Sequence, residues 1–146
     1  MTKCQEVMTP NPVCCLSSDK VDRAAQIMKA EDVGSIPVIE GLQARRVVGI
    51  VTDRDIVLKV VANGRDPENV FVNEIMTGRP VTCRLDDDLQ HLLHAMAEHQ
   101  VRRIPIVDIQ NRIVGIVAQG DVATRMEEPV KTAEVVRKIS RPTVEA

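Results

Sequence analysis

The chain carries the same set of short motifs twice, in the same order and at nearly constant spacing. Two motifs recur 68 positions later and the third recurs 66 positions later, so one loop of the second copy is two residues shorter. The pairs are Val7-Met8-Thr9 with Ile75-Met76-Thr77, Ile36-Pro37-Val38 with Ile104-Pro105-Ile106, and Gly49-Ile50-Val51 with Gly115-Ile116-Val117. A unit of this length is too small to bury an efficient core alone. We therefore expect the two copies to pack about a pseudo-twofold axis, with function in the cleft between them.

The composition is that of a globular chain. Of its 146 residues, 44% are hydrophobic and 27% are charged, which is typical of one domain or of two half-domains that share a core. No apolar run approaches the length of a membrane span, and the N-terminal residues lack the apolar stretch of a secretory signal. We therefore expect a cytoplasmic protein with no membrane segment.

Charge and aromatic content argue against nucleic acid as a partner. The net charge is −2, whereas affinity for nucleic acid comes largely from cationic side chains that neutralise phosphates. Phe71 is the only residue among Phe, Tyr and Trp, so the chain has almost no rings on which bases could stack. A planar ligand would have to lie between aliphatic side chains and backbone, and a mononucleotide meets that condition.

Each copy has the pattern of a strand, a helix, two strands and a second helix. Apolar residues at helical spacing form one stripe in each copy, and short β-branched runs predict the strands. Ser17-Ser18-Asp19 and Asp86-Asp87-Asp88 offer capping oxygens before the first helix of each copy, and Gly34 suits the end of the first one. The sequence therefore predicts the α/β (α+β) class, with two βαββα repeats. The stripes are Val21, Ala24, Ala25 and Met28, then Leu89, Leu92, Leu93 and Met96; the strands are 13–15, 36–39, 47–51, 104–107 and 113–117; the second helices are 53–61 and 121–126.

The motif boundaries divide the chain into four segments. We predict the first repeat at 1–62 and the second at 74–126, joined by a polar linker at 63–73. Beyond the second repeat the pattern stops, and 127–146 is predicted as an extension with one short helix at 131–139 and a frayed end.

The cysteines and histidines lack the spacing that is typical of a metal site. The cysteines form no C-x-x-C motif, so we expect small buried residues that stay reduced, with a redox or metal role as the alternative. His91 and His94 lie three residues apart on a predicted helix, close enough to share a metal, but both point away from its apolar stripe. We therefore expect solvated histidines, no metal site and no required cofactor. The remaining residues of these types are Cys4, Cys14, Cys15, Cys83 and His99.

Near the end of each copy stands a junction of the same residue types. Residues 49–55 read Gly-Ile-Val-Thr-Asp-Arg-Asp, and 115–121 read Gly-Ile-Val-Ala-Gln-Gly-Asp. Together with the repeated Met-Thr and Ile-Pro-Val motifs, these junctions resemble a tandem pair of CBS domains, named after cystathionine β-synthase, which form a Bateman module. The resemblance runs from about Glu6 to about Met126. One motif alone would be a weak signal, whereas two ordered copies at constant spacing are a strong one.

The resemblance implies a ligand site at each junction. In the family, Asp and Thr or Ser residues at this place contact the ribose and phosphate of AMP, ADP, ATP or S-adenosylmethionine, and the adenine lies in an apolar slot of the opposite repeat. A hydroxyl at a strand end and a carboxylate on the first helical turn suit a sugar, and a helix N-terminus favours phosphate. The first pocket so implied comprises Thr52, Asp55, Thr77, Val81, Thr82, Arg102, Arg103, Ile104 and Pro105; the second, weaker pocket comprises Asp121, Thr9, Val13, Cys14, Ser35 and Ile36.

The two implied pockets differ in chemistry. Ala118 stands where Thr52 does, so the second pocket lacks the hydroxyl at the strand end. Gly34-Ser35 stands where Arg102-Arg103 does, so it also lacks the basic pair that suits phosphate oxygens. We therefore hypothesise one competent phosphate-bearing site, built on Asp55 and the two arginines. The alternative is that the junction aspartates only complement the helix dipole.

The resemblance implies a regulatory function. We expect a module that senses adenosine nucleotides and signals to an unknown effector protein, and family modules commonly pair into homodimers through their repeat helices. The alternative is a non-enzymatic interaction or scaffold module with a vestigial pocket. We do not expect an enzyme, because the sequence offers no nucleophile with a base, no P-loop and no ligand set with metal spacing.

Overall fold

The computed structural model describes residues 1–125, and the extension predicted at 127–146, with its helix, lies outside the described residues. The chain divides into two compact units. Unit 2 contains Val13–Pro80 and Gln110–Ile113, and unit 1 contains Met1–Pro12, Val81–Ile109 and the residues from Val114 onward. Each unit therefore draws on both halves of the sequence.

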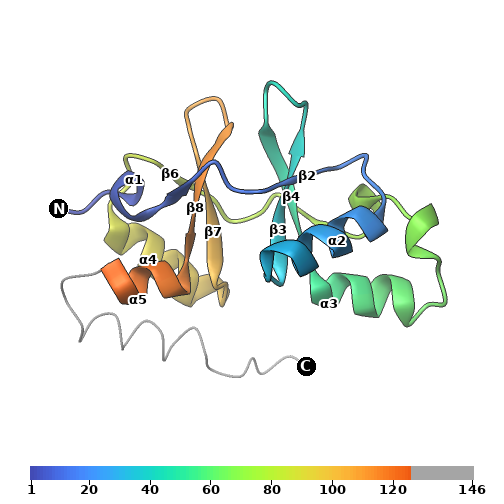
Figure 1. Cartoon of the computed structure of the whole chain (residues 1–146). Coiled ribbons are helices and arrows are strands. Elements are labelled where there is room, and N and C mark those ends of the chain that lie inside the picture. The colour runs from blue at the N-terminus through green and yellow to red at the C-terminus, as the bar shows by residue number, and fades with distance from the viewer. Residues whose placement is uncertain (126–146) are drawn as a thin grey trace. The chain divides into compact units, whose positions relative to one another are not determined.

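Unit 2 has the predicted order of a strand, a helix, two strands and a helix (Figure 1). Its strands form one sheet in the order β2-β3-β4-β5, with β2 parallel to β3 and the other neighbours antiparallel. The second helix begins as α3 and continues without a break into a π-helical turn, η1. The bounds are β2 (Cys15–Leu16), α2 (Val21–Glu31), β3 (Ser35–Glu40), β4 (Arg46–Thr52), α3 (Asp53–Ile56), η1 (Val57–Val61), η2 (Pro67–Asn69), η3 (Val72–Glu74) and β5 (Thr77–Gly78).

Unit 1 repeats this architecture (Figure 1). Its sheet has the order β1-β8-β7-β6, which matches the order β5-β4-β3-β2 of unit 2 strand for strand. The predicted mixed class, with two βαββα repeats, is therefore confirmed. The bounds are α1 (Cys4–Val7), β1 (Thr9–Pro10), β6 (Cys83–Arg84), α4 (Leu89–His99), β7 (Arg103–Val107), β8 (Ile113–Ala118) and α5 (Gln119–Arg125).

The first segment of each sequence repeat lies in the unit that is built mainly from the other repeat. β1 pairs antiparallel with β8 in unit 1, and β5 pairs antiparallel with β4 in unit 2. The turns before these strands follow the same rule. In unit 1, Cys4 N donates to Asp87 O at 2.9 Å, and in unit 2, Val72 N donates to Asp19 O at 2.8 Å. The repeats defined by motifs and the units defined by packing thus differ at their first strand.

The ends of the first helices only partly match expectation. Asp88 caps α4, as predicted, by accepting a backbone N–H. α2 has Lys20 at its N-cap position, and Asp19 instead accepts a backbone N–H in the turn that precedes the helix. α2 ends at Glu31, and its C-cap is Asp32 and not Gly34, because Asp32 takes the left-handed conformation with φ 54°.

Each unit has its own hydrophobic core. In unit 1 all four residues of the predicted α4 stripe are buried, and they pack with β7, β8 and α1. In unit 2 the predicted stripe is wrong at one position: Ala25 is exposed and Ile27 is buried instead. The larger Ile side chain removes more apolar area from water than Ala would, which favours this rotation of the buried face. Among residues 1–125, no helix combines the length and apolar character needed to cross a bilayer.

A glycine in one strand of each unit permits close approach of a methionine. A Cβ on Gly49 of β4 would lie 2.5 Å from Met76 Sδ and 2.8 Å from the Thr77 carbonyl oxygen. A Cβ on Gly115 of β8 would overlap the Sδ of Met8 and lie 2.8 Å from its Cγ. The repeated Met and Gly motifs of the sequence are therefore two halves of one contact, made once in each unit.

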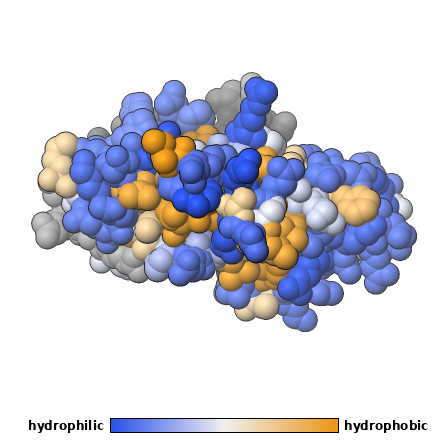
Figure 2. Space-filling view, turned by 90° about the horizontal axis from the view of Figure 1, so that it is seen from above, coloured by the Kyte–Doolittle hydropathy of each residue, from blue (hydrophilic) through white to orange (hydrophobic). Residues whose placement is uncertain are grey.

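Gln110–Ile113 belongs to unit 2 because it pairs with the start of β4. Val47 N donates to Asn111 O at 3.1 Å, and Ile113 N donates to Arg45 O at 2.9 Å. A hollow of about 370 Å³ beside this pairing is lined by Ala44, Arg46, Gln110 and Arg112. None of these four residues belongs to the predicted pockets. Figure 2 looks from above onto the hairpin ends and shows a mainly hydrophilic face with scattered hydrophobic patches.

Candidate functional site

The junction of β4 and α3 in unit 2 forms a reciprocal cap. Thr52 is the N-cap residue, and its Oγ1 accepts a hydrogen bond from Asp55 N at 3.0 Å. Asp55 Oδ2 in turn accepts a hydrogen bond from Thr52 N at 3.0 Å. This arrangement satisfies two backbone donors at a helix start and fixes both side chains. A hydroxyl and a carboxylate are therefore held side by side at the end of β4.

The Asp55 carboxylate has a second partner that sequence analysis missed. Lys59 Nζ lies 3.1 Å from Asp55 Oδ1, and it also donates to the Ile75 carbonyl at 2.9 Å. The Asp55 side chain is only 14% exposed. A carboxylate has about four acceptor positions, so Asp55 retains capacity for further donors beyond these bonds. The spacing of Asp55 and Lys59, four residues apart on a helix, is the signal that could have found this pair.

The equivalent junction in unit 1, between β8 and α5, has only one of these two cap hydrogen bonds. Asp121 Oδ2 accepts a hydrogen bond from Ala118 N at 3.1 Å, as Asp55 does from Thr52. Ala118 has no hydroxyl, so the reciprocal bond from its side chain is missing. The reciprocal cap is therefore complete at the junction of unit 2 and incomplete at the junction of unit 1.

In each unit a backbone hydrogen bond joins the first residue of the helix at the junction to the residue that precedes β3 or β7. In unit 2, Asp53 N donates to Gly34 O at 2.9 Å, and in unit 1, Gln119 N donates to Arg102 O at 2.8 Å. A Cβ on Gly34 would lie 3.0 Å from Asp53 Oδ2. The Asp53 carboxylate therefore occupies the space beside Gly34, which is the counterpart of Arg102 in the other repeat.

The two arginines of the predicted phosphate site differ in their surroundings. Arg102 is exposed, whereas Arg103, the first residue of β7, is partly buried. Burial lowers the pKa of Arg103 from its ordinary value, and the carboxylate of Asp121 opposes that shift. Arg103 therefore interacts electrostatically with Asp121 within unit 1, although the two residues are predicted in different pockets.

The other residues of the predicted pockets are distributed over both units. Thr77 of β5 pairs with Ile50 of β4, so it lies in the same unit as Thr52 and Asp55, although its sequence repeat is the second one. Thr9 pairs with Ile116 and lies in the unit of Asp121. The partly exposed or exposed residues are Val13, Cys14 and Ser35 in unit 2 and Val81 and Thr82 in unit 1; the buried residues are Ile36 in unit 2 and Ile104 and Pro105 in unit 1.

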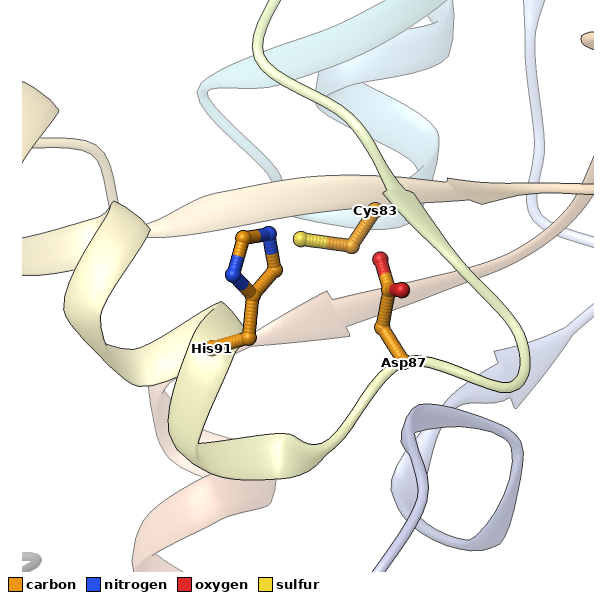
Figure 3. Close-up of side chains that lie close together, drawn as sticks. All are labelled: Cys83, Asp87 and His91. Atoms are coloured by element: carbon orange, nitrogen blue, oxygen red, sulfur yellow. The ribbon is translucent and has the colours of Figure 1, made fainter.

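A cluster of three metal-ligating residue types lies in unit 1, and the sequence analysis did not identify it. The ligand atoms of Cys83, Asp87 and His91 all lie within 4.8 Å of one another (Figure 3). His91 is thus near Cys83 and Asp87, whereas His94 Nε2 lies 3.7 Å from Glu98 Oε2. The signal in the sequence was the spacing of Asp87 and His91, four residues apart across the start of a helix.

Three of the four cysteines are buried, as predicted, and Cys14 is partly buried. Burial, reinforced by the charge of Asp87, raises the pKa of Cys83 to about 11. Burial likewise raises the pKa of Cys4 to about 12, with smaller effects of Cys83, Asp87 and Asp88. These thiols are therefore protonated at neutral pH unless a cation replaces the proton.

Comparison with protein families gives one match. The model of the CBS domain matches residues 4–62 and again residues 72–128. Among curated proteins, the CBS domain-containing protein YhcV of Bacillus subtilis is 35% identical over 144 residues, which cover 99% of each chain. Protein YlbB of the same organism is 36% identical over 140 residues, which cover 96% of this chain and 93% of the relative.

Solved structures of similar proteins agree with this match. A crystal structure of hypoxic response protein I with two coordinated zinc ions has a TM-score of 0.78 and 33% identity, and covers 86% of this chain and 99% of that one. The CBS domain pair of protein MJ0100, in complex with 5′-methylthioadenosine and S-adenosyl-L-methionine, has a TM-score of 0.73 and 26% identity, with 85% and 94% covered. CBSX2 in complex with AMP has a TM-score of 0.71 and 25% identity, with 94% and 99% covered.

Proposed function

Because the chain belongs to the CBS domain family and carries two such domains in tandem, we propose that it is a cytoplasmic regulatory module. In this role it binds an adenosine-type ligand (AMP, ADP, ATP or S-adenosylmethionine) and signals to a separate effector protein. The observation that carries the proposal is the reciprocal cap of Thr52 and Asp55, which holds a hydroxyl and a carboxylate together at a helix N-terminus. The similar CBS pairs solved with AMP or with S-adenosyl-L-methionine support the ligand class.

The chemistry suggests a role for each of the four polar residues on which the proposal mainly depends. Asp55 accepts hydrogen bonds from the ribose hydroxyls, and Thr52 adds a donor at the strand end. Arg102 and Arg103 hold phosphate oxygens, for which the planar guanidinium is well suited. Binding of the ligand favours one conformation of the module, and the effector protein responds to that shift in population.

The first test uses the unusual absorbance of this protein. With Phe71 as its only aromatic residue, the chain absorbs almost nothing in the near ultraviolet, so a bound adenine would dominate the spectrum. We expect the purified protein to release a nucleotide or S-adenosylmethionine on denaturation, identified by mass spectrometry. The same compound, added back at about 100 times its dissociation constant, should stabilise the fold by about 2.7 kcal/mol. If none of the adenosine compounds raised the melting temperature, that result would contradict the proposal.

A scaffold module with a vestigial pocket is the second candidate. The bonds that already engage both oxygens of Asp55, and the missing hydroxyl at Ala118, favour it. Such a module would bind its effector protein equally well with and without adenosine ligands. Binding measured in both conditions therefore separates the two candidates.

We also propose that the module forms a homodimer through its repeat helices. Val57, Leu58 and Val61, on the η1 turn of the second helix in unit 2, are 54%, 47% and 63% exposed. Neighbouring apolar residues on one helix are a common feature of subunit interfaces. Leu58→Glu should therefore shift the protein from dimer to monomer in sedimentation analysis. Leu42→Glu is the matched control, because Leu42 is 77% exposed outside this helix. A wild-type monomer, or a dimer unaffected by Leu58→Glu, would contradict this interface.

A further inference from the structure

We propose that Cys83, Asp87 and His91 bind a divalent metal ion of the zinc class. These residues come from β6, from the turn that follows it and from the first turns of α4 (Figure 3). In Figure 3 the thiol and the imidazole point toward one another, and the carboxylate lies beside both. The cluster shares no residue with the proposed ligand site, so metal binding and nucleotide binding can succeed or fail independently.

The geometry is close to what a zinc ion requires. Zinc bonds to sulfur, nitrogen and oxygen are about 2.0–2.3 Å long, so the ligand atoms of a tetrahedral site lie about 3.3–3.8 Å apart. The three ligand atoms here lie within 4.8 Å of one another, so a contraction of about 1 Å closes the site. His91 is exposed and can turn to make that movement, while Cys83 is fixed in the core at 3% exposure.

The protein already holds the carboxylate in place. Asp87 Oδ2 accepts a hydrogen bond from Arg84 N at 2.7 Å, which orients the side chain toward β6. Among the residues that the structure describes, Asp87 Oδ1, the Cys83 thiol and the His91 ring have no hydrogen-bond partner. Asp87 Oδ2 thus fixes the position of the side chain, and Oδ1 remains available to bind the metal. Hydrogen bonds to the metal-binding residues hold those residues in place in other metal sites in the same way.

Unit 2 contains the same turn without the imidazole. Cys15 and Asp19 are the counterparts of Cys83 and Asp87, and Asp19 Oδ2 likewise accepts a backbone N–H, at 2.8 Å. Arg23 stands in the place of His91, and a guanidinium stays protonated and cannot bind a cation. The thiol and the carboxylate are therefore common to both copies of the fold, whereas the metal-ligating histidine is specific to unit 1.

Cys4 of the N-terminal segment lies near the cluster but is not one of its three grouped ligands. Cys4 is fully buried, its backbone donates to Asp87 O at 2.9 Å, and its thiol interacts electrostatically with Cys83 and Asp87. Its counterpart in unit 2 is Val72, which has no ligand atom. The three ligands of the cluster leave one position of a tetrahedral shell, which a water molecule can complete.

The ligand types select the metal class. A thiolate, an imidazole and a carboxylate form a mixed set that suits zinc and its substitute cobalt, and disfavours magnesium or calcium, which prefer oxygen. On binding, the Cys83 thiol loses its proton to solvent as the sulfur–metal bond forms, so one proton is released for each thiol that becomes a ligand.

Cobalt provides the test, because thiolate bound to Co²⁺ gives a charge-transfer band in the near ultraviolet. The lack of Trp and Tyr leaves that region almost free of protein absorbance. We expect chelator-treated full-length protein, kept reduced, to develop the band with one equivalent of Co²⁺ and to lose it when Zn²⁺ is added. His91→Ala removes a residue that binds the metal directly. It should therefore weaken Co²⁺ binding by more than the roughly 10–100-fold that is lost when a hydrogen-bond partner of such a residue is removed.

Matched variants make the outcome decisive. His94→Ala changes an exposed histidine on the same helix and should bind Co²⁺ like the wild type. Cys15→Ala, in unit 2, should retain the band, while Cys83→Ala should abolish it. Cys83 is in the core, so Cys83→Ala could fail to fold. In that case the comparison of His91→Ala with the wild type decides the test, because His91 is exposed. No band in the wild type, or equal affinity of His91→Ala and His94→Ala, would overturn the proposal.

Discussion

Replacing Asp55 with alanine should abolish the stabilisation of this protein by its adenosine ligand, whereas Asp121→Ala should leave most of it intact. Asp55 is held beside a hydroxyl by a reciprocal cap, and Asp121 follows an alanine that cannot offer one. At a ligand concentration about 100 times the dissociation constant, the wild type gains about 2.7 kcal/mol, and the Asp55→Ala variant should gain close to none. Calorimetric melting with and without ligand measures both values.

Each variant must be compared with its own ligand-free baseline. Asp55→Ala also removes an acceptor for Thr52 N and the partner of Lys59, so loss of the cap alone should cost about 1 kcal/mol of stability. Asp55→Asn retains an acceptor oxygen for the cap and is the conservative control. Equal loss of ligand response in the Asp55 and Asp121 variants would contradict the hypothesis of one competent site.

Gly49→Ala should lower the free energy of unfolding by about 2 kcal/mol, because overpacking a close contact typically costs 1–3 kcal/mol. The new Cβ would meet both Met76 Sδ and the Thr77 carbonyl oxygen, and that backbone atom can move away only if β5 shifts. Gly115→Ala should also destabilise the protein, but there the three nearest atoms all belong to the Met8 side chain. Chemical denaturation of the variants measures the differences.

Gly78→Ala is the matched control for this prediction. Gly78 is the strand partner of Gly49, a Cβ added to it would have no neighbouring atom within 4 Å, and its φ is not positive. Alanine there should be neutral or stabilising by a few tenths of a kcal/mol. Shortening the methionine should relieve the overlap more at Gly115 than at Gly49, because the Thr77 oxygen remains. If all three glycine variants had the same stability, close packing would not explain the repeated pairing of Met and Gly in the two units.

Features set by local sequence were predictable. The spacing of Leu89, Leu92, Leu93 and Met96 identified α4 and its buried face, and the β-branched runs identified the long strands. The difference between Thr52 and Ala118 is likewise local, because it decides which junction has the reciprocal cap. These features depend on hydrophobic periodicity and on bonds between residues a few positions apart, which the sequence records directly.

Features set by contacts between distant segments were not predictable. Ala25 and Ile27 compete for one buried position, and the packing around α2 decides between them. The pairing of β1 with β8 joins residues more than 100 positions apart, and nothing in Thr9 or Ile116 specifies that partner. The approach of His91 to Cys83 likewise depends on how a helix lies beside a strand.

The crossing of first strands between the units has a consequence for the origin of the chain. A half-chain of residues 1–62 would contain Gly49 and β4 but not the Met76 segment that covers them. It would, however, contain Met8 and Thr9, which play that part for the second copy. Two identical half-chains could therefore complete each other by domain swapping. Gene duplication and fusion would turn that concentration-dependent assembly into an intramolecular one. The sequences of the two halves could then diverge.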